Sequence, residues 1–280
     1  MEKKNFFLNI AGNLREFPSP CVMGIINITP DSYYSESRVC DEKSAFKRCE
    51  KLLQEGAAII DIGAVSTIPF SDYPGEEEEI KRLMSVFPAL RKEFPDAVFS
   101  IDTYKANVAR IILDEGADII NDISGGELDE KMFPLIAEKK APYIIMHMRG
   151  TPKNMQDLTD YGDLLKEVNN YFSQKISTLT QMGVSDIIVD PGFGFSKTVE
   201  QNYQLLKHAE TFCFHGLPVL IAISRKSMIY KVLDSKPEDV LPGTMALQTI
   251  ALLKGASILR VHDVGAAMQA VKLVNYLQEV

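Results

Sequence analysis

The 280-residue chain contains no tryptophan, has only four cysteines and four histidines, and carries fewer Lys and Arg residues (30) than Asp and Glu residues (38). The net charge of −8 argues against the broad cationic surface that nucleic acids and anionic membranes require in a partner. The cysteines show no paired spacing, which argues against a disulfide framework or a zinc site. They are Cys21, Cys40, Cys49 and Cys213. We therefore expect a reducing compartment, with the cytoplasm as the natural location.

Long apolar runs are absent as well. No segment approaches the ~20 apolar residues that a membrane-spanning helix needs. The short run Phe6-Phe7-Leu8 follows a charged start but breaks at Asn9, too early for the hydrophobic region of a signal peptide. We therefore expect neither a membrane span nor a membrane partner.

Several common catalytic signatures are also missing. The chain has no Walker loop, no HExxH sequence, no nucleophile elbow and no catalytic Ser-His-Asp order. No Gly-x-Gly-x-x-Gly turn follows its first apolar run, which argues against an open dinucleotide-binding sheet. The hydrophobic content of 46% is sufficient for a full core, and the length is close to the ~250 residues of a single (β/α)8 barrel.

The most informative pattern present is a series of eight short apolar runs, each ending in a polar or charged residue. These runs are Val22–Ile26 before Asn27, Ile59–Ile60 before Asp61, Val98–Ile101 before Asp102, Ile119–Ile120 before Asn121, Tyr143–Met146 before His147, Ile187–Val189 before Asp190, Val219–Ile223 before Ser224, and Ile258–Leu259 before Arg260 and His262. Buried parallel strands read as continuous apolar runs, and catalytic groups of a barrel gather where the strands end. The pattern therefore predicts a (β/α)8 barrel, also called a TIM barrel, with one active site.

Helical segments separate these runs, and we predict helices over 42–54, 76–94, 104–115 and 163–182. Glycines at 56, 116, 183 and 255 follow helices and precede apolar strands, as left-handed helix caps do. An open doubly wound sheet also alternates strands and helices, but it fits the count of eight less well. We expect one barrel domain over residues 18–280, with residues 1–17 forming a short strand or hairpin that closes the bottom of the barrel.

The sequence Asp190-Pro-Gly-Phe-Gly-Phe195 is the most specific single motif. An aspartate that leaves a buried strand places a carboxylate at the floor of a pocket, and a carboxylate accepts two parallel N–H bonds from a flat aminopyrimidinone edge. A phenyl ring such as that of Phe195 can cover the heterocycle. The plainer interpretation is that Asp190 caps the next helix.

Cations follow the last two strands. Lys226 belongs to Ser224-Arg-Lys-Ser227, which opens a helix, and Arg260 and His262 alternate so that both point to one side. The loops after strands seven and eight are the usual phosphate-binding region of this fold, although a surface Arg-Lys pair is often only solvated charge.

Asp102 and Asn121 end consecutive strands and can bind one ligand, or form an ordinary polar layer. The carboxylates of residues 76–79 begin a helix and are read as structural.

Together with Gly24–Ser32, Ser100–Lys105 and Met146–Pro152, these motifs occur in the order found in the dihydropteroate synthase family, the target of sulfonamide drugs. The chain resembles this family from about Cys21 to Val264. The resemblance implies condensation of p-aminobenzoate with 6-hydroxymethyl-7,8-dihydropterin diphosphate, which yields 7,8-dihydropteroate and pyrophosphate. It also suggests a homodimer.

The resemblance further implies a role for individual residues. The pterin would be bound by Asp190 and Asn121 at its aminopyrimidinone edge, and by Asp102, Met146 or Met148, and Lys226 around the ring. The diphosphate would be held by Asn27, Arg260 and His262, with Mg²⁺ bridging its oxygens and Asn27. The p-aminobenzoate would be bound by Phe195, Lys226 and Ser227, with Thr67 and Pro69 from the second loop.

An aromatic amine is a weak nucleophile, and no residue of the chain resembles a dedicated strong base for it. We therefore expect catalysis to favour departure of pyrophosphate from the pterin methylene. Mg²⁺, Arg260 and His262 would neutralise the leaving group, and Asp102 would stabilise the positive charge on the pterin; Lys226 completes the catalytic set.

The second loop departs from the family pattern. Ala64, Val65, Ile68 and Phe70 stand where the family usually has glycine, glutamate, arginine and glycine, and Ala222 replaces a common glycine. The altered loop suggests one alternative, a catalytically silent pterin-binding paralogue. A second alternative is a pterin-dependent methyltransferase domain, which shares the barrel and the pterin-binding carboxylate and asparagine but has no use for a diphosphate site.

Overall fold

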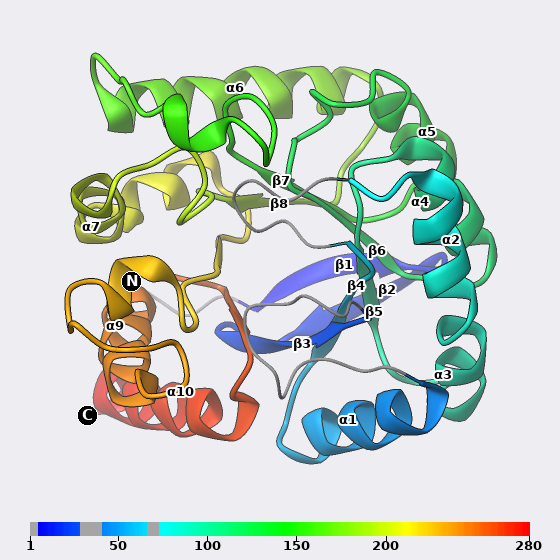
Figure 1. The fold of residues 1–280 in the computed structure, drawn as a ribbon, viewed down its shortest axis with the longest axis horizontal. Helices are drawn as coiled ribbons and strands as arrows, with labels where there is room; N and C mark the ends of the chain where they lie inside the picture. Colours follow the sequence, from blue (N-terminus) through cyan, green and yellow to red (C-terminus); the bar gives the residue numbers. More distant parts are fainter. Residues whose placement is uncertain (1–4, 29–40, 66–72) are drawn as a thin grey trace.

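The computed structural model describes residues 5–28, 41–65 and 73–280, and it is a (β/α)8 barrel, as the sequence predicts (Figure 1). Eight parallel strands form one sheet in the order β8-β7-β6-β5-β4-β3-β10-β9. Their bounds are Cys21–Asn27 (β3), Ile59–Gly63 (β4), Phe99–Asp102 (β5), Ile119–Asp122 (β6), Tyr143–Met146 (β7), Ile187–Asp190 (β8), Leu220–Ile221 (β9) and Ile258–Val261 (β10). A parallel bridge between Val189 and Val219 joins the two ends of the sheet and closes the barrel.

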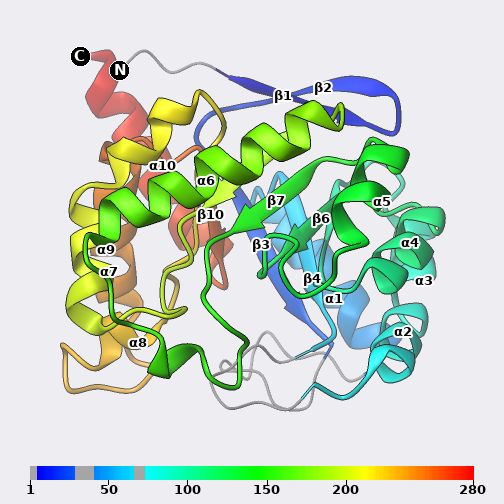
Figure 2. The same ribbon diagram turned by 90° about the horizontal axis from the view of Figure 1, so that it is seen from above.

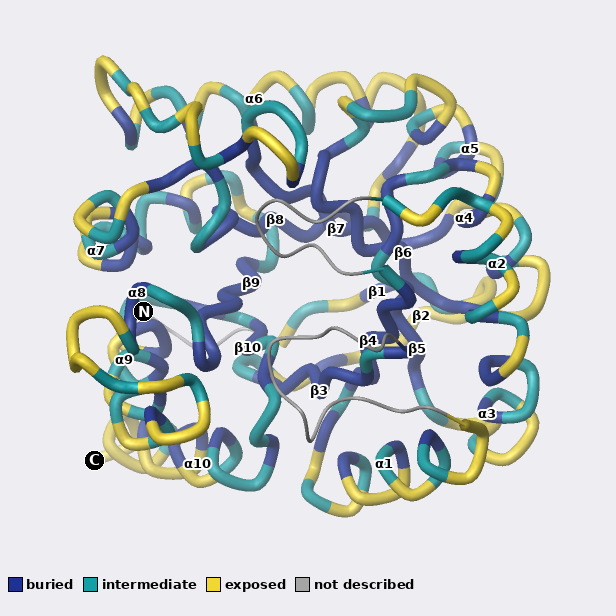
Figure 3. Tube along the Cα trace, in the orientation of Figure 1, coloured by how far each residue is buried: buried dark blue, intermediate teal, exposed yellow. Residues whose placement is uncertain are grey.

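Helices surround the strands, and Figure 3 shows buried strands inside a ring whose outer surface is exposed. The α-helices are Glu42–Gln54 (α1), Glu76–Met84 (α2), Phe87–Glu93 (α3), Ala106–Asp114 (α4), Met132–Lys139 (α5), Leu164–Gln181 (α6), Val199–Lys207 (α7), Ser227–Tyr230 (α8), Leu241–Leu253 (α9) and Val264–Glu279 (α10). In the described part of the chain, short 3-10 helices span Met155–Asp157 (η2) and Ala209–His215 (η3). Helix α1 has the predicted bounds, and Asp41 caps it through a hydrogen bond from the Ser44 amide.

One predicted helix is divided in two. We expected a continuous helix over 76–94, but α2 ends at Met84 and α3 begins at Phe87. Pro88 explains the break, because proline lacks an N–H and its ring clashes with the carbonyl of the fourth residue before it, here Met84. At the start of α3 the same proline is well tolerated.

Several strands differ from the predicted runs at one or both ends, and two of these differences are the largest. Strand β4 continues to Gly63, so Asp61 lies within the strand, fully buried, and not at its end. Strand β9 covers only Leu220–Ile221, shorter than the predicted run from Val219 to Ile223, although that run is buried throughout.

The amino-terminal segment forms an antiparallel hairpin of β1 (Phe6–Ile10) and β2 (Asn13–Phe17), which lies across one end of the barrel in Figure 2. Leu8 and Phe17 of the hairpin are buried in one cluster with barrel-lining residues such as Met23, Ile59 and Ile119. The hairpin therefore covers the apolar interior at the amino-terminal ends of the strands and leaves the opposite end for the polar residues.

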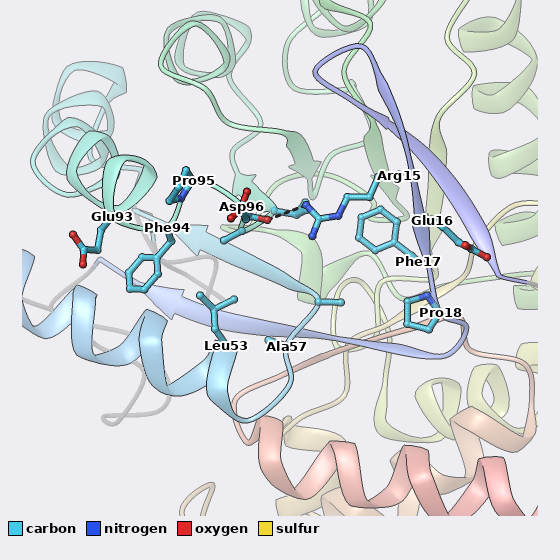
Figure 4. Close-up of a pocket in the computed structure, with 13 residues that line it drawn as sticks. Arg15, Glu16, Phe17, Pro18, Leu53, Ala57, Glu93, Phe94, Pro95 and Asp96 are labelled. Atoms are coloured by element: carbon cyan, nitrogen blue, oxygen red, sulfur yellow. Dashed lines mark hydrogen bonds between the residues drawn. The ribbon is translucent and has the colours of Figure 1, made fainter.

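A pocket of about 440 Å³ lies at this hairpin end. Its lining includes Arg15, Phe17, Leu53 and Phe94, and Arg15 donates a hydrogen bond to the carbonyl of Asp96 at 3.0 Å (Figure 4). None of the predicted site residues that the structure describes lines this pocket. Among the described residues, no helix combines the length and the apolar character needed to cross a bilayer.

Candidate active site

Arg260 of β10 lies at the centre of the polar residues that end the strands. Its Nε donates to Oδ2 of Asp61 at 2.7 Å, and its Nη2 lies 2.6 Å from the same oxygen. The same Nη2 donates to Oδ2 of Asp102 at 2.9 Å. Burial opposes the charge on Arg260, but the carboxylates of Asp61 and Asp102 outweigh burial and raise the pKa of the guanidinium above its usual value. Three strands thus contribute to one ionic cluster.

Strand register explains why Asn27 and Asp102 lie on either side of Gly63. Gly63 of β4 pairs with Asn27 of β3 on one side and with Asp102 of β5 on the other. A side-chain carbon at Gly63 would lie 3.5 Å from the amide oxygen of Asn27 and 3.6 Å from the Cβ of Asp102. The absence of a side chain at Gly63 therefore leaves Asn27 and Asp102 facing a common space at the carboxyl end of the barrel.

Asp190 and Lys226 form the second part of the cluster. Asp190 of β8 is buried and its Oδ1 accepts a hydrogen bond from the Gly192 amide at 2.8 Å, so the carboxylate holds its own loop and does not cap helix α7. Lys226 donates to the carbonyl of Phe193 at 2.6 Å, and its Nζ lies 4.9 Å from the centre of the Phe195 ring. Electrostatic interactions link Asp190 to both Lys226 and Arg260. The residues predicted for the pterin therefore share one region.

The glycine in this loop has a clear steric reason. Gly192 has a φ of +70°, and a side-chain carbon there would lie 2.1 Å from the carbonyl oxygen of His147. Any other residue would push the loop after β8 away from the loop after β7. Gly192 thus fixes where Asp190 and Phe195 lie relative to Met146 and Met148.

Asn121 and Asp122 are adjacent in sequence but differ in role. The Nδ2 of Asn121 lies 3.3 Å from Oδ2 of Asp61, within the barrel. Asp122 accepts hydrogen bonds from the Ser124 amide at 2.7 Å, the Gly126 amide at 2.9 Å and the Tyr143 hydroxyl at 2.5 Å. Its carboxylate is therefore occupied in holding the loop after β6, and we assign Asp122 a structural role.

An apolar wall borders the polar cluster. Tyr104, Met146, Met148 and Met155 are buried together, and the partly buried ring of Phe195 packs against them. A flat heterocycle gains both dispersion contacts and exclusion of water from such a wall. The wall brings together Met146, Met148 and Phe195, which the resemblance implies for pterin and p-aminobenzoate.

His262 and Ser227 lie beside the cluster on the last two loops. Nδ1 of His262 is 3.1 Å from Oγ of Ser224, and burial together with the nearby charge of Arg260 lowers the pKa of His262 to about 3. The imidazole is therefore neutral at physiological pH and acts through hydrogen bonds. Ser227 is half-buried and is the first residue of α8, a helix of a single turn.

Two ionisable residues of the cluster have pKa values near neutrality. Burial raises the pKa of Asp102 to about 7, with the opposing charge of Arg260 and the like charge of Asp61 as smaller effects. Burial lowers the pKa of Lys226 to about 8, against the attraction of Asp190. Groups that titrate near pH 7 are typical of sites that do acid–base or charge-stabilising chemistry.

Arg225 stands next to Lys226 in the sequence but does not join the site. It binds Asp263 through both Nε, at 2.8 Å, and Nη2, at 2.9 Å, and its Nη1 donates to the carbonyls of Pro237 and Glu238. This buried arginine holds the loop after β9 against the start of α10. It has a structural role that the motif alone does not reveal.

Sequence reasoning missed Asp61 as a member of the site. A carboxylate within the apolar run Ile59–Ile62 was the available signal, because an unpaired charge is rarely buried in a strand. Thr67 and Pro69, predicted for p-aminobenzoate, lie outside the described residues, as do the altered positions Ile68 and Phe70. All other predicted site residues lie at the carboxyl end of the barrel.

Comparison with known proteins agrees with this geometry. The family model described as "Pterin binding enzyme" matches residues 23–262. The dihydropteroate synthase of Synechocystis is 43% identical over 259 residues, which cover 91% of this chain and 89% of that protein. This chain belongs to the dihydropteroate synthase family. The family membership excludes the methyltransferase alternative.

Solved structures of other dihydropteroate synthases share the whole fold. The Yersinia pestis dihydropteroate synthase, determined with a sulfonamide drug complex, superposes with a TM-score of 0.93 at 36% identity and covers 98% of this chain and 100% of that one. The Xanthomonas albilineans dihydropteroate synthase with 4-aminobenzoic acid superposes with a TM-score of 0.89 at 33% identity, over 99% and 100% of the two chains. The departures in the second loop therefore occur within an otherwise conserved synthase architecture.

Proposed function

We propose that this dihydropteroate synthase forms 7,8-dihydropteroate by departure of pyrophosphate from the pterin methylene, followed by attack of the p-aminobenzoate amine. The methylene C–O bond breaks with its electron pair going to pyrophosphate. The amine nitrogen then forms the new C–N bond and loses a proton. The observation that carries this mechanism is the anchored guanidinium of Arg260 between Asp61 and Asp102, a preorganised positive charge at the carboxyl end of the barrel.

The pterin is assigned to the space among Asp190, Asn121 and Lys226. Asp190 supplies a buried carboxylate acceptor and Asn121 an amide at the same depth. The thioether side chains of Met146 and Met148 supply the apolar face. We expect Asp190→Asn to weaken pterin binding strongly, because an amide cannot accept two parallel N–H bonds as a carboxylate does.

The diphosphate is assigned to Asn27, Arg260 and His262. Mg²⁺ prefers oxygen ligands and usually keeps one or two from the protein and the rest from phosphate and water. The amide oxygen of Asn27 faces the same space as Asp102, so the residues present fit such an ion, with Asn27 as its ligand. When bound, Mg²⁺ would neutralise the negative charge that develops on the oxygens of the leaving diphosphate. Arg260 donates N–H bonds to the same group, and His262 adds a neutral donor.

Asp102 and Phe195 complete the site. As pyrophosphate leaves, positive charge spreads over the pterin ring, and the ionised carboxylate of Asp102 stabilises that charge at short range. The p-aminobenzoate is assigned to the aromatic face of Phe195, with the stem of Lys226 beside it and Ser227 at the start of α8. Thr67 and Pro69 of the second loop are proposed to contribute to p-aminobenzoate binding.

Pyrophosphate release by the purified protein tests the proposal. The protein is incubated with the pterin diphosphate and Mg²⁺, with and without p-aminobenzoate, while pyrophosphate and dihydropteroate are both followed. Equal amounts of the two products, formed only with both substrates, are expected. Binding of the pterin diphosphate without turnover would instead identify a silent pterin-binding paralogue.

We also propose a homodimer that assembles through α9 and α10. These adjacent helices expose apolar side chains that a monomer would leave in water: Ile250, Leu253, Leu273, Tyr276 and Leu277. A variant that carries both Leu273→Glu and Leu277→Glu should be monomeric by light scattering at a concentration where the wild type is dimeric.

We further propose a cytoplasmic location from the cysteine pattern, and cell fractionation tests it.

A further inference from the structure

Asp61 and Arg260 form the tightest ionic contact of the site. Both Nε and Nη2 of Arg260 contact one carboxylate oxygen, Oδ2 of Asp61, at 2.7 and 2.6 Å. The amide Nδ2 of Asn121 approaches the same carboxylate, 3.4 Å from Oδ1 and 3.3 Å from Oδ2. Asn121 of β6 thus contacts Asp61 from one side, and Asp61 in turn holds Arg260 of β10.

Asp61 is too deep in the barrel to meet substrate itself. Its side chain is 0% exposed, whereas that of Arg260 is 17% exposed. Its register partner on β5, Ser100, is buried, and Oγ of Ser100 has no hydrogen-bond partner among the described residues. The hydrogen bonds to Asp61 therefore come from Arg260 and Asn121, and its charge also acts on Asp102, so any effect of Asp61 on the reaction passes through these three residues.

The contacts of Arg260 divide its guanidinium into two edges. Nε and Nη2 are directed at Asp61 and Asp102. Nε and Nη2 both donate to carboxylates, but no described residue accepts a hydrogen bond from Nη1. A guanidinium is planar and rigid, so fixing one edge fixes the direction of the other.

We propose that Asp61 is a positioning residue that holds Arg260 so that Nη1 faces the departing diphosphate. This inference rests on the role of Arg260 in the proposed function. Without Asp61, the arginine keeps its charge but can rotate toward Asp102 or Asp190, and the energy of reorienting it is added to the barrier. Asp61 thus contributes to turnover without contacting substrate.

A double-mutant cycle of Asp61→Asn and Arg260→Ala tests the inference, with kcat for pyrophosphate release as the readout. We expect Asp61→Asn to lower kcat by about 10–100-fold and Arg260→Ala by about 100–1,000-fold, the range for losing one transition-state donor. Because Asp61 acts through Arg260, the double variant should be no slower than Arg260→Ala. Multiplied losses in the double variant would overturn the inference.

Asp118→Asn is the matched control. Asp118 is also a buried carboxylate, and its Oδ2 accepts from Nη2 of Arg91 at 2.8 Å, but it precedes β6 at the opposite end of the barrel. We expect this variant to lose stability while kcat stays within about twofold of wild type. An equal loss of kcat in Asp118→Asn and Asp61→Asn would mean that general loosening, not positioning, explains the effect.

Arg260→Lys provides a test that leaves Asp61 unchanged. A lysine ammonium drawn to Asp61 has no second nitrogen to direct elsewhere, so kcat should fall nearly as far as in Arg260→Ala. A lysine variant within about threefold of wild type would show that position is unimportant and would overturn the inference. A wild-type protein without turnover, in contrast, would refute the proposed function and not the positioning role.

Discussion

The ammonium of Lys197 lies 3.0 Å from Nδ1 of His147, and the two buried side chains join the loops after β7 and β8. Lys197 also donates to the carbonyls of His147 at 3.2 Å, Gly192 at 3.0 Å and Phe195 at 2.8 Å. Burial lowers the pKa of Lys197 well below its usual value and that of His147 to about 2. A neutral imidazole that accepts at Nδ1 fits this arrangement, so His147 is structural and not a catalytic base.

Replacing Lys197 by methionine should destabilise the protein and loosen the p-aminobenzoate side of the site. The change leaves several buried acceptors without a donor, and we expect a loss of about 2–4 kcal/mol in the free energy of unfolding. The KM for p-aminobenzoate should rise more than kcat falls, since the carbonyl of Phe195 loses its partner. Urea unfolding and steady-state kinetics measure both effects. Exposed Lys92, changed to methionine, serves as the control, and equal unfolding midpoints for the two variants would refute this role.

Asp263→Asn should be strongly destabilising, because it leaves the buried guanidinium of Arg225 without its counter-charge. The side chains of Arg225 and Asp263 are only 5% and 17% exposed, and breaking such a pair costs about 3–5 kcal/mol. Since Lys226 follows Arg225 directly, pterin binding should weaken too. Glu138→Gln, which removes an exposed partner of Arg110, should leave the melting temperature unchanged. Similar melting temperatures for Asp263→Asn and wild type would contradict this assignment.

The pH dependence of kcat/KM should be bell-shaped. Asp102 must be ionised to stabilise the pterin cation, so activity rises as pH increases through about 7, the pKa to which burial raises this carboxyl. Lys226 must be protonated, so activity falls as pH increases through about 8, its pKa in the buried site. Stopped assays between pH 5 and 10 measure the profile. In Asp102→Asn the acidic limb should disappear while the alkaline limb remains; an unchanged acidic limb would assign it to another group.

Removal of Mg²⁺ should abolish turnover without unfolding the protein. Within the described residues, no group of three or more His, Cys, Asp or Glu side chains is placed to hold a metal ion. The protein ligand proposed for Mg²⁺ is the amide oxygen of Asn27, and phosphate and water would supply the others. Chelation with EDTA is expected to stop pyrophosphate release and to leave the melting temperature unchanged. Restored activity on adding Mg²⁺ completes the test. Full turnover in EDTA would remove Mg²⁺ from the mechanism.

Much of the site was predictable because a parallel barrel brings all strand ends to one face. Asn27, Asp102, Asn121, Asp190 and the pair Arg260 and His262 were found from their place after apolar runs, and the structure has them at that face. The break at Pro88 was also visible in the sequence, since proline cannot continue a helix, but the apolar periodicity on either side concealed it.

Other roles depended on contacts between distant segments. Arg225 and Lys226 are neighbouring cations in a loop, yet one is neutralised by Asp263 and the other faces Asp190. Lys197 resembles a surface lysine until two loops place four acceptors around it.

The sequence by itself determined the barrel, the end of it that carries the chemistry and the family of the chain, because strand periodicity and loop motifs are local properties. Only the tertiary structure decided which charges are paired and which face the substrates. Asp61 lies 199 positions before Arg260, and the two residues meet because β3 pairs with β4 on one side and with β10 on the other. The strength of a charge interaction depends on the distance between the charges and on their burial, and neither can be read from the amino-acid sequence alone.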